Sequence, residues 1–342
     1  MTTPRFGFCC KWLDDPAEAA GRKPNSASRD LNGRSTTMRW LREHADEAEQ
    51  RQWDIMNHNA RAALLMVERV GAMPPERRMV RLGSEMLQGY TEPSWIDWWQ
   101  RREIQDHCER IFRPVGDAAR NLGVRLSFHP GQFCVLASES DEIVQRSILE
   151  FEYHADMARW MGFGQDWHDE GFKINVHLSG KGGAAKFLQT LQKLSPEARN
   201  LITIENDEVS NGLDSTLLVA EHVALVLDIH HHWVKTGEYI SPTDSRVQRV
   251  VESWRGVRPV LHFSTSREDI LVGHDAASRP DLNALLAGGF KKQQLRAHSD
   301  FCWNNAVNDW ALSFSDQFDI QVEAKGKNLA TDQLHKQWLT NA

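Results

Sequence analysis

The chain has 342 residues, 41% of them hydrophobic, and a formal net charge of −7. This length suits one large α/β domain or two ordinary ones, and the acidic balance argues against a protein that coats DNA through an overall basic surface. No apolar run of about 18 residues predicts a membrane helix, and the first residues lack the apolar core of a signal peptide. The five scattered cysteines show no CxxC spacing. We therefore expect a cytoplasmic protein with reduced thiols and no membrane contact.

Short apolar runs rich in Val, Ile, Leu and Phe recur along the chain. They occupy residues 5–10, 79–84, 124–129, 172–177, 201–207, 223–230, 258–264 and 319–325. Their near-continuous apolarity is typical of strands buried on both faces, as in a parallel sheet. Stretches with helical periodicity lie between them, at residues 38–70, 103–121, 141–161, 184–194, 212–221 and 244–254.

A strand–helix unit repeated eight times predicts a (β/α)8 TIM barrel. The alternative, a doubly wound open sheet, usually carries a glycine-rich phosphate turn after its first strand, but here that strand is followed by CCKWLDD. No linker interrupts the pattern. We therefore predict a single domain over residues 1–342, with a core at about 5–327 and a C-terminal tail at 328–342.

Residues that bind protons and metals end six consecutive predicted strands, and in a barrel those ends meet at one face. They are His129, His177, Glu205, Asp228, His262 and Glu323. A lone histidine at such a place is more often structural, but burying this many ionisable groups without a metal would be costly. Imidazole and carboxylate ligands without thiolate suit manganese, zinc or iron, and several carboxylates allow two or three ions. Such clusters generate hydroxide and neutralise phosphate charge.

The stretch DIHHH, residues 228–232, leaves one assignment open. In a regular strand, His230 and His232 share the side of Asp228. A turn that begins after Ile229 would instead bring His231 inward. Periodicity does not decide between the two.

The motifs resemble those of the UV damage endonuclease (UvdE) family, in order and spacing, from about residue 5 to 327. They are RFGFCC, HPGQF, NVHLSG, IENDE, LDIHHH, LHFS and VEAKGK. The resemblance implies a TIM barrel with up to three manganese-type ions that nicks damaged duplex DNA immediately 5′ of the lesion. The family's ligands fall on His129, His177, Glu205, Asp228, His231, His262, His274 and Glu323. Lys325 and Lys186 are placed to meet phosphate.

Several positions depart from the family pattern. Phe8 and Phe133 stand where the family often has tyrosine; with Gln132 they resemble residues that wedge into the duplex, and phenylalanine can still stack on bases. Val260 stands where members carry a lysine, reported there as carboxylated. The Trp-rich segment 83–99 replaces a Ser/His-rich stretch, and it either covers the core or forms a new substrate wall.

The leading prediction is a metal-dependent endonuclease for UV-damaged duplex DNA. Glu205, Asp228 and Glu323 would hold the ions, and Lys325 would stabilise negative charge. We expect a monomer without a nucleotide cofactor, and a local basic rim on the acidic body. Candidates for this rim are Arg34, Arg39, Lys181, Lys186, Arg267, Lys291 and Lys292.

Two other classes of function remain open from the sequence. A divergent TIM-barrel metalloenzyme would act on abasic DNA, another phosphodiester or a sugar, as isomerases and epimerases do; a closed pocket would favour the sugar. A DNA-binding protein that has lost catalysis would contain almost no metal.

Overall fold

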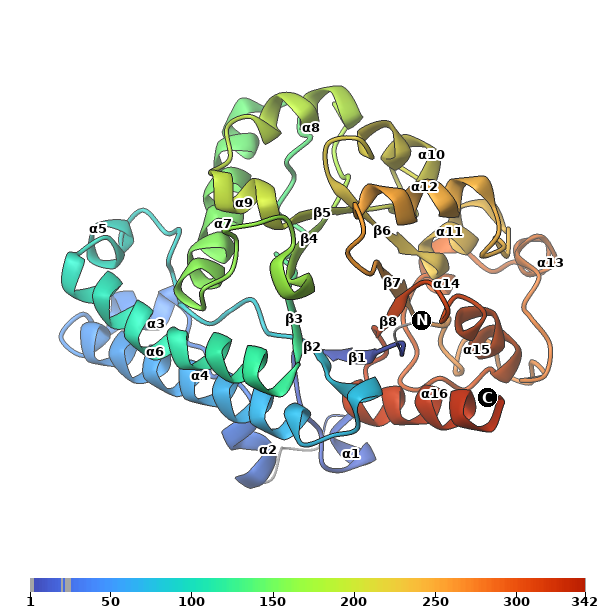
Figure 1. Cartoon of the computed structure of the whole chain (residues 1–342), viewed down its shortest axis with the longest axis horizontal. Coiled ribbons are helices and arrows are strands. Elements are labelled where there is room, and N and C mark those ends of the chain that lie inside the picture. Colours follow the sequence, from blue (N-terminus) through green and yellow to red (C-terminus); the bar gives the residue numbers. More distant parts are fainter. Residues whose placement is uncertain (1–2, 20, 22–25, 342) are drawn as a thin grey trace.

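Eight parallel strands form a closed barrel in which each strand pairs with its neighbours in the sequence (Figure 1). The computed structural model describes residues 3–19, 21 and 26–341. The strands are β1 (Phe6–Cys9), β2 (Met79–Arg81), β3 (Arg125–Phe128), β4 (Lys173–His177), β5 (Ile202–Glu205), β6 (Ala224–Asp228), β7 (Val260–Phe263) and β8 (Asp319–Val322). β1 pairs with β8 and closes the ring. The predicted (β/α)8 TIM barrel is confirmed.

Side chains alternate along each strand between the helical layer and the barrel interior. In β4, Ile174 and Val176 join the main hydrophobic core. Asn175, between them, points inward: its amide donates to the carboxylate of Glu205 and its carbonyl accepts from the Thr203 hydroxyl at 2.8 Å. The interior is therefore polar toward the carboxyl ends of the strands.

The amino ends of the strands enclose a small apolar floor. Met79, Ala224, Val226, Trp254 and Val260 form a buried cluster of their own. Because the floor closes one end of the barrel, the polar interior opens only at the other end, where TIM-barrel sites lie.

The helices surround the barrel. They are α1 (Pro16–Ala19), α2 (Ser26–Leu31), α3 (Met38–Glu43), α4 (Ala48–Gly71), α5 (Ile96–Trp99), α6 (Arg102–Leu122), α7 (Asp141–Trp160), α8 (Gly183–Leu191), α9 (Pro196–Leu201), α10 (Leu213–Thr216), α11 (Ile229–Thr236), α12 (Ser245–Ser253), α13 (Leu282–Ala287), α14 (Lys292–Leu295), α15 (Asn305–Leu312) and α16 (Lys327–Asn341), with 3-10 turns at Pro75–Arg77, Asp169–Gly171 and Leu217–Val219. None of the described helices combines the length and apolarity needed to cross a bilayer.

The predicted helical elements are largely present, with three differences. The stretch 212–221 contains only the short α10, followed by the 3-10 turn at Leu217–Val219. The stretch 38–70 is divided into α3 and α4, because His44 ends the first helix and a turn follows. Residues 328–341, expected as a tail, belong to α16, which packs against β1 (Figure 1). Its buried Ala330 and Leu334 complete the layer over the strand that closes the barrel.

Candidate metal centre

Glu205, at the carboxyl end of β5, is the centre of the candidate site. It is fully buried, and its Oε2 lies 3.5 Å from Nε2 of His129, 3.8 Å from Nε2 of His177 and 3.1 Å from Nδ1 of His262. Its Oε1 lies 3.5 Å from Nδ1 of His231. Four imidazoles, each at or just after a strand, thus lie around the carboxylate of Glu205.

Two groups of candidate ligand atoms share Glu205. The first contains His129, His177 and Glu205; the second contains Glu205, Asp228, His262 and Glu323; the ligand atoms in each lie within 4.8 Å of one another. Nδ1 of His262 is 3.3 Å from Oε1 of Glu323, which brings β8 into the second group. The two groups could hold divalent cations, with Glu205 common to both.

Buried polar atoms in this cluster lack partners, which tests whether its residues fit a metal. Oε1 of Glu205, Oδ2 of Asp228 and Nδ1 of His262 are buried without a hydrogen bond among the described residues. Native proteins seldom leave such atoms unpaired unless an ion or water completes them. The donor set, imidazoles and carboxylates around one small volume, therefore fits a divalent cation.

The electrostatics also favour cations. Burial raises the pKa of Asp228 well above its usual value, and the charges of Glu205 and Glu323 add to the rise. Burial opposes ionisation of Glu205 too, but the imidazoles of His262 and His177 outweigh it and lower its pKa. For Glu323, Arg81 overcomes burial in the same way and lowers the pKa. Three crowded carboxylates thus depend on nearby positive charge.

Contacts with backbone carbonyls favour one tautomer in three imidazoles of the cluster. Nδ1 lies next to a backbone carbonyl in each: 2.8 Å from Pro130 O in His129, 3.1 Å from Asn206 O in His231, and 3.1 Å from Glu323 O in His298. An N–H donated there leaves the lone pair on Nε2. Such second contacts are usual for histidines that bind metals.

The local structure after β6 answers the question raised by DIHHH. The strand ends at Asp228, and α11 begins at Ile229. Oδ1 of Asp228 accepts from the backbone N–H of His231 at 2.7 Å, so the aspartate caps the helix. His231 therefore turns toward Glu205, whereas His232 contacts Glu238 at 2.9 Å. The geometry agrees with the residue that the family resemblance implied.

His274, which the family resemblance implied as a ligand, lies apart from the cluster, and His298 lies nearer to it. Nε2 of His274 lies 3.0 Å from the carbonyl of Ser278, and the ring faces Trp303, outside both ligand groups. The backbone of His298 instead bridges to Ser266 just after β7, and its ring lies 6.3 Å from that of His231. His298 was not among the residues predicted from the sequence, because it lies far from any strand end, with α15 between it and β8.

Two basic residues beside the cluster were also missed. Arg81, at the end of β2, forms an ion pair with Glu323. Lys173 places Nζ 3.2 Å from Nε2 of His262. Burial lowers the pKa of Lys173 to about 7, and Arg81 adds to the lowering. Arg81 ends β2 and Lys173 begins β4, so each stands at the edge of an apolar run.

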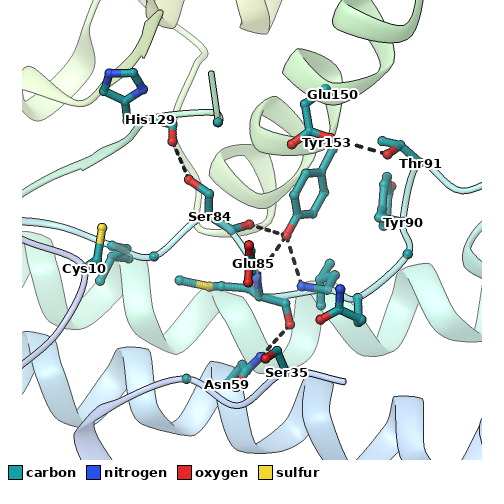
Figure 2. A pocket seen from close by; sticks show the side chains of 18 of the residues that line it. Cys10, Ser35, Asn59, Ser84, Glu85, Tyr90, Thr91, His129, Glu150 and Tyr153 are labelled. Atoms are coloured by element: carbon teal, nitrogen blue, oxygen red, sulfur yellow. Dashed lines mark hydrogen bonds between the residues drawn. The ribbon is translucent and has the colours of Figure 1, made fainter. Parts of the chain in front are cut away.

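A groove of about 1360 Å³ adjoins the cluster, and His129 is among the residues that line it (Figure 2). One wall is the segment after β2, which the hydroxyl of Tyr153 holds by accepting from the N–H groups of Met86 and Leu87 at 3.1 and 3.0 Å. The hydroxyl of Ser84 donates to the carbonyl of His129 at 2.5 Å. The wall is thereby tied to a candidate ligand.

The family model for UV-endonuclease UvdE matches residues 4–341. The chain belongs to the UvdE family. Among curated relatives, the UV DNA damage endonuclease of Bacillus cereus (strain B4264) is 24% identical over 236 residues, which is 66% of this chain and 65% of the relative. A putative UV-damage endonuclease of Acanthamoeba polyphaga mimivirus is 32% identical over 188 residues, 52% of this chain and 56% of the relative. The matches thus span 65% and 56% of these two relatives' length, less than two thirds of each.

Solved structures agree in fold. SacUVDE superposes with a TM-score of 0.72 at 22% identity, covering 99% of both chains. Endonuclease IV from Thermus thermophilus superposes with a TM-score of 0.53 at 14% identity, covering 82% of this chain and 95% of that one. Both are evidence for the barrel.

Positions where this UvdE member departs from the family pattern have separate roles. Val260 packs in the apolar floor beside Met79 and Trp254. In the segment 83–99, Trp98 and Trp99 are buried in the core, whereas residues 83–93 line the groove. The segment therefore both covers the core and forms a wall.

The residues predicted to contact DNA differ in exposure to solvent. Phe133 is 85% exposed at the groove, and Gln132 beside it is also exposed. Phe8 has no exposed surface, because it points into the helical layer, where its ring meets Trp12. A contact between Phe8 and DNA would require these side chains to move.

The predicted phosphate contacts and basic rim are partly engaged within the protein. Lys186 pairs with Asp141 at 2.8 Å, and Lys325 with Asp300 at 3.3 Å. A phosphate would have to displace Asp141 and Asp300 before it could contact these lysines. Other members of the rim also have partners: Arg39 with Glu43, Arg267 with Asp269, and Lys292 with the carbonyl of Lys235.

Proposed function

We propose that the protein is a metal-dependent endonuclease that nicks UV-damaged duplex DNA immediately 5′ of the lesion. The observation that carries this proposal is the buried cluster around Glu205, with its unpaired ligand atoms, at the open end of a UvdE-family barrel. Divalent ions bound there would supply hydroxide at neutral pH and offset charge on a phosphate.

The candidate ligands fall into two sets, one for each of two ions. His129 and His177 would hold one ion, and Asp228, His262 and Glu323 a second, with Glu205 between them. His231 and His298 border this cluster through the contacts described above, so both are candidates for completing either site or a third. We favour His298 over His274 for this reason. Manganese is the proposed metal, with zinc or iron as alternatives.

The groove supports a nucleic-acid substrate. Phe133 stands at its edge with an exposed ring, suited to stacking on a base or wedging between two. The groove's lining also includes the partly buried ring of Tyr90, which would offer apolar surface to bases displaced from the duplex. Lys325 and Lys186 would meet the backbone after leaving their carboxylate partners.

The decisive experiment is a strand-nicking assay with Mn2+ on end-labelled duplexes that are intact, UV-irradiated or abasic. Glu205→Gln is the control, because it removes the bridging charge with little change in volume. We expect a nick just 5′ of the photoproduct, absent with the control variant. Cleavage only at abasic sites would assign the protein to that substrate, and no cleavage by metal-loaded protein would exclude both. Location in the cytoplasm and the monomeric state stay predictions.

A further inference from the structure

Arg81 is a basic residue at the open end of the barrel. It ends β2, and its side chain points into the barrel, because the preceding Val80 points outward into the main hydrophobic core. Nη1 of its guanidinium forms an ion pair with Glu323. Since arginine keeps its charge at any working pH, the positive charge at this place is permanent.

The ion pair with Glu323 leaves part of the guanidinium of Arg81 without a partner. Nε is buried without a hydrogen bond, and Nη2 has no hydrogen-bond partner among the described residues. The side chain is 14% exposed, so part of the guanidinium reaches solvent. A guanidinium can donate to two acceptors at once, and phosphate oxygens are among the acceptors that it binds best.

Arg81 lies where the ligand cluster meets the groove. Its backbone carbonyl accepts from the N–H of Cys10 at 2.7 Å, and Cys10, Leu82 and His129 line the groove. Its side chain contacts Glu323, which belongs to the second ligand group. A DNA strand with its lesion in the groove and its backbone at the cluster would therefore place the phosphate 5′ of the lesion beside Arg81.

Other basic residues near the open face are less suited to this contact. Lys173 lies deeper in the barrel and is 1% exposed. Lys186 and Lys325 each pair with an aspartate that belongs to neither ligand group. Arg81 combines contact with a candidate ligand, access to solvent and unpartnered N–H groups.

We propose that Arg81 is a catalytic residue: it keeps Nη1 on Glu323 and donates through Nη2 to a non-bridging oxygen of the scissile phosphate. The inference rests on the proposed function, since it requires a phosphodiester at the cluster. As water attacks phosphorus and the bond to the 3′ oxygen breaks, leaving a 3′-hydroxyl and a 5′-phosphate, negative charge is carried by the non-bridging oxygens. A donor aimed at such charge typically contributes about 100- to 1000-fold to the rate.

Three variants test this role. Arg81→Met removes the charge at similar length, and Arg81→Lys keeps the charge at a single point that cannot serve both acceptors in the same way. Arg102→Met, at an exposed arginine at the start of α6, is the matched control. Single-turnover nicking of UV-irradiated duplex is measured at saturating Mn2+. We expect a rate about 100- to 1000-fold lower for Arg81→Met, an intermediate rate for Arg81→Lys, and the wild-type rate for Arg102→Met.

Mn2+ affinity, measured by electron paramagnetic resonance of the free ion, separates this role from one of holding Glu323 in place. If Arg81 only positioned Glu323, Arg81→Met would bind Mn2+ more weakly and excess Mn2+ would restore nicking. We expect Arg81→Met to bind Mn2+ at least as tightly as the wild type, because it removes a positive charge beside the site. Excess Mn2+ should leave its nicking slow. If Arg81→Met does not fold, Arg81→Lys must still nick more slowly than the wild type.

Failure of this inference and failure of the proposed function are distinguishable. Wild-type protein that does not nick irradiated duplex in the presence of Mn2+ would overturn both. If the wild type nicks, an unchanged rate in Arg81→Met, or recovery of that variant by excess Mn2+, would overturn the role of Arg81 alone.

Discussion

Asp228 and His231 are joined by a hydrogen bond that ends a strand and starts a helix. Oδ1 of Asp228 accepts from the backbone N–H of His231 at 2.7 Å, while Oδ2 lies 3.6 Å from Nδ1 of the same histidine and has no hydrogen-bond partner among the described residues. One carboxylate thus caps α11 with one oxygen and faces the cluster with the other. The structural and the metal-binding roles of Asp228 can therefore be separated by mutation.

Asp228→Asn should keep the cap and lose the ligand charge, whereas Asp228→Ala should lose both. Asparagine caps helices about as well as aspartate, and replacing a cap by alanine costs about 0.5–2 kcal/mol. In metal-free protein, urea unfolding should therefore show Ala less stable than Asn by about that amount. Mn2+ should raise the Tm of the wild type more than that of either variant. Equal stability of the two variants would contradict the capping role.

His298→Ala should weaken Mn2+ binding by about tenfold or more, and by much more than His274→Ala does. The reason is position: His298 lies beside Glu323 and His231, whereas His274 contacts Ser278 and Trp303. Isothermal titration calorimetry of both purified variants is the measurement. A larger loss in His274→Ala would restore the ligand set that the family resemblance first implied.

Phe133→Ala should reduce nicking without changing Mn2+ affinity, because the ring is 85% exposed and belongs to neither group of candidate ligand atoms. Stacking of a base on an aromatic ring contributes about 1–3 kcal/mol, or roughly 5- to 150-fold in kcat/KM. Phe133→Tyr should retain activity, since it keeps the ring. Leu339→Ala, at a 58% exposed residue on α16, serves as the surface control. Full activity of Phe133→Ala would exclude a wedge at this position.

His168, beneath the barrel floor, should make stability fall in acid. Burial lowers its pKa from 6.5 to about 3, so the folded state keeps it neutral while the unfolded state takes up a proton. Its contribution is complete above pH 6.5 and is lost as pH falls toward 3. At pH 5 the loss is about 2 kcal/mol, from the linkage relation.

His168→Asn isolates this effect. The backbone there is left-handed, with φ 44° and ψ 46°, which asparagine tolerates, and the amide can still donate to the carbonyl of Phe172. Free energies of unfolding measured between pH 7 and pH 4.5 should fall less steeply in the variant. Parallel profiles would show that His168 does not titrate as described.

Much of the fold and of the site was predictable from the sequence. Short apolar runs predicted all eight strands, because burial on both faces leaves a local signal. The residues that end β3 to β8 were predicted to converge, and the structure brings His129, His177, Glu205, Asp228, His262 and Glu323 together. Parallel strands force this convergence once the barrel closes.

Contacts between distant parts of the chain were not predictable in the same way. The direction in which His231 points depends on the helix cap by Asp228 at the start of α11. The position of His298 beside the cluster depends on how the segment after β7 folds back to Ser266. The sequence predicted that Phe8 contacts DNA, but packing against the helical layer buries its ring completely.

The sequence by itself determined the barrel, the family and the chemical character of its open face, since these follow from periodicity and from residue types at strand ends. Only the tertiary structure decided which histidine faces the cluster, which nitrogen of His262 points inward, and that Lys173 lies behind it. Those properties depend on distances across the barrel, and local patterns do not encode the packing that sets them.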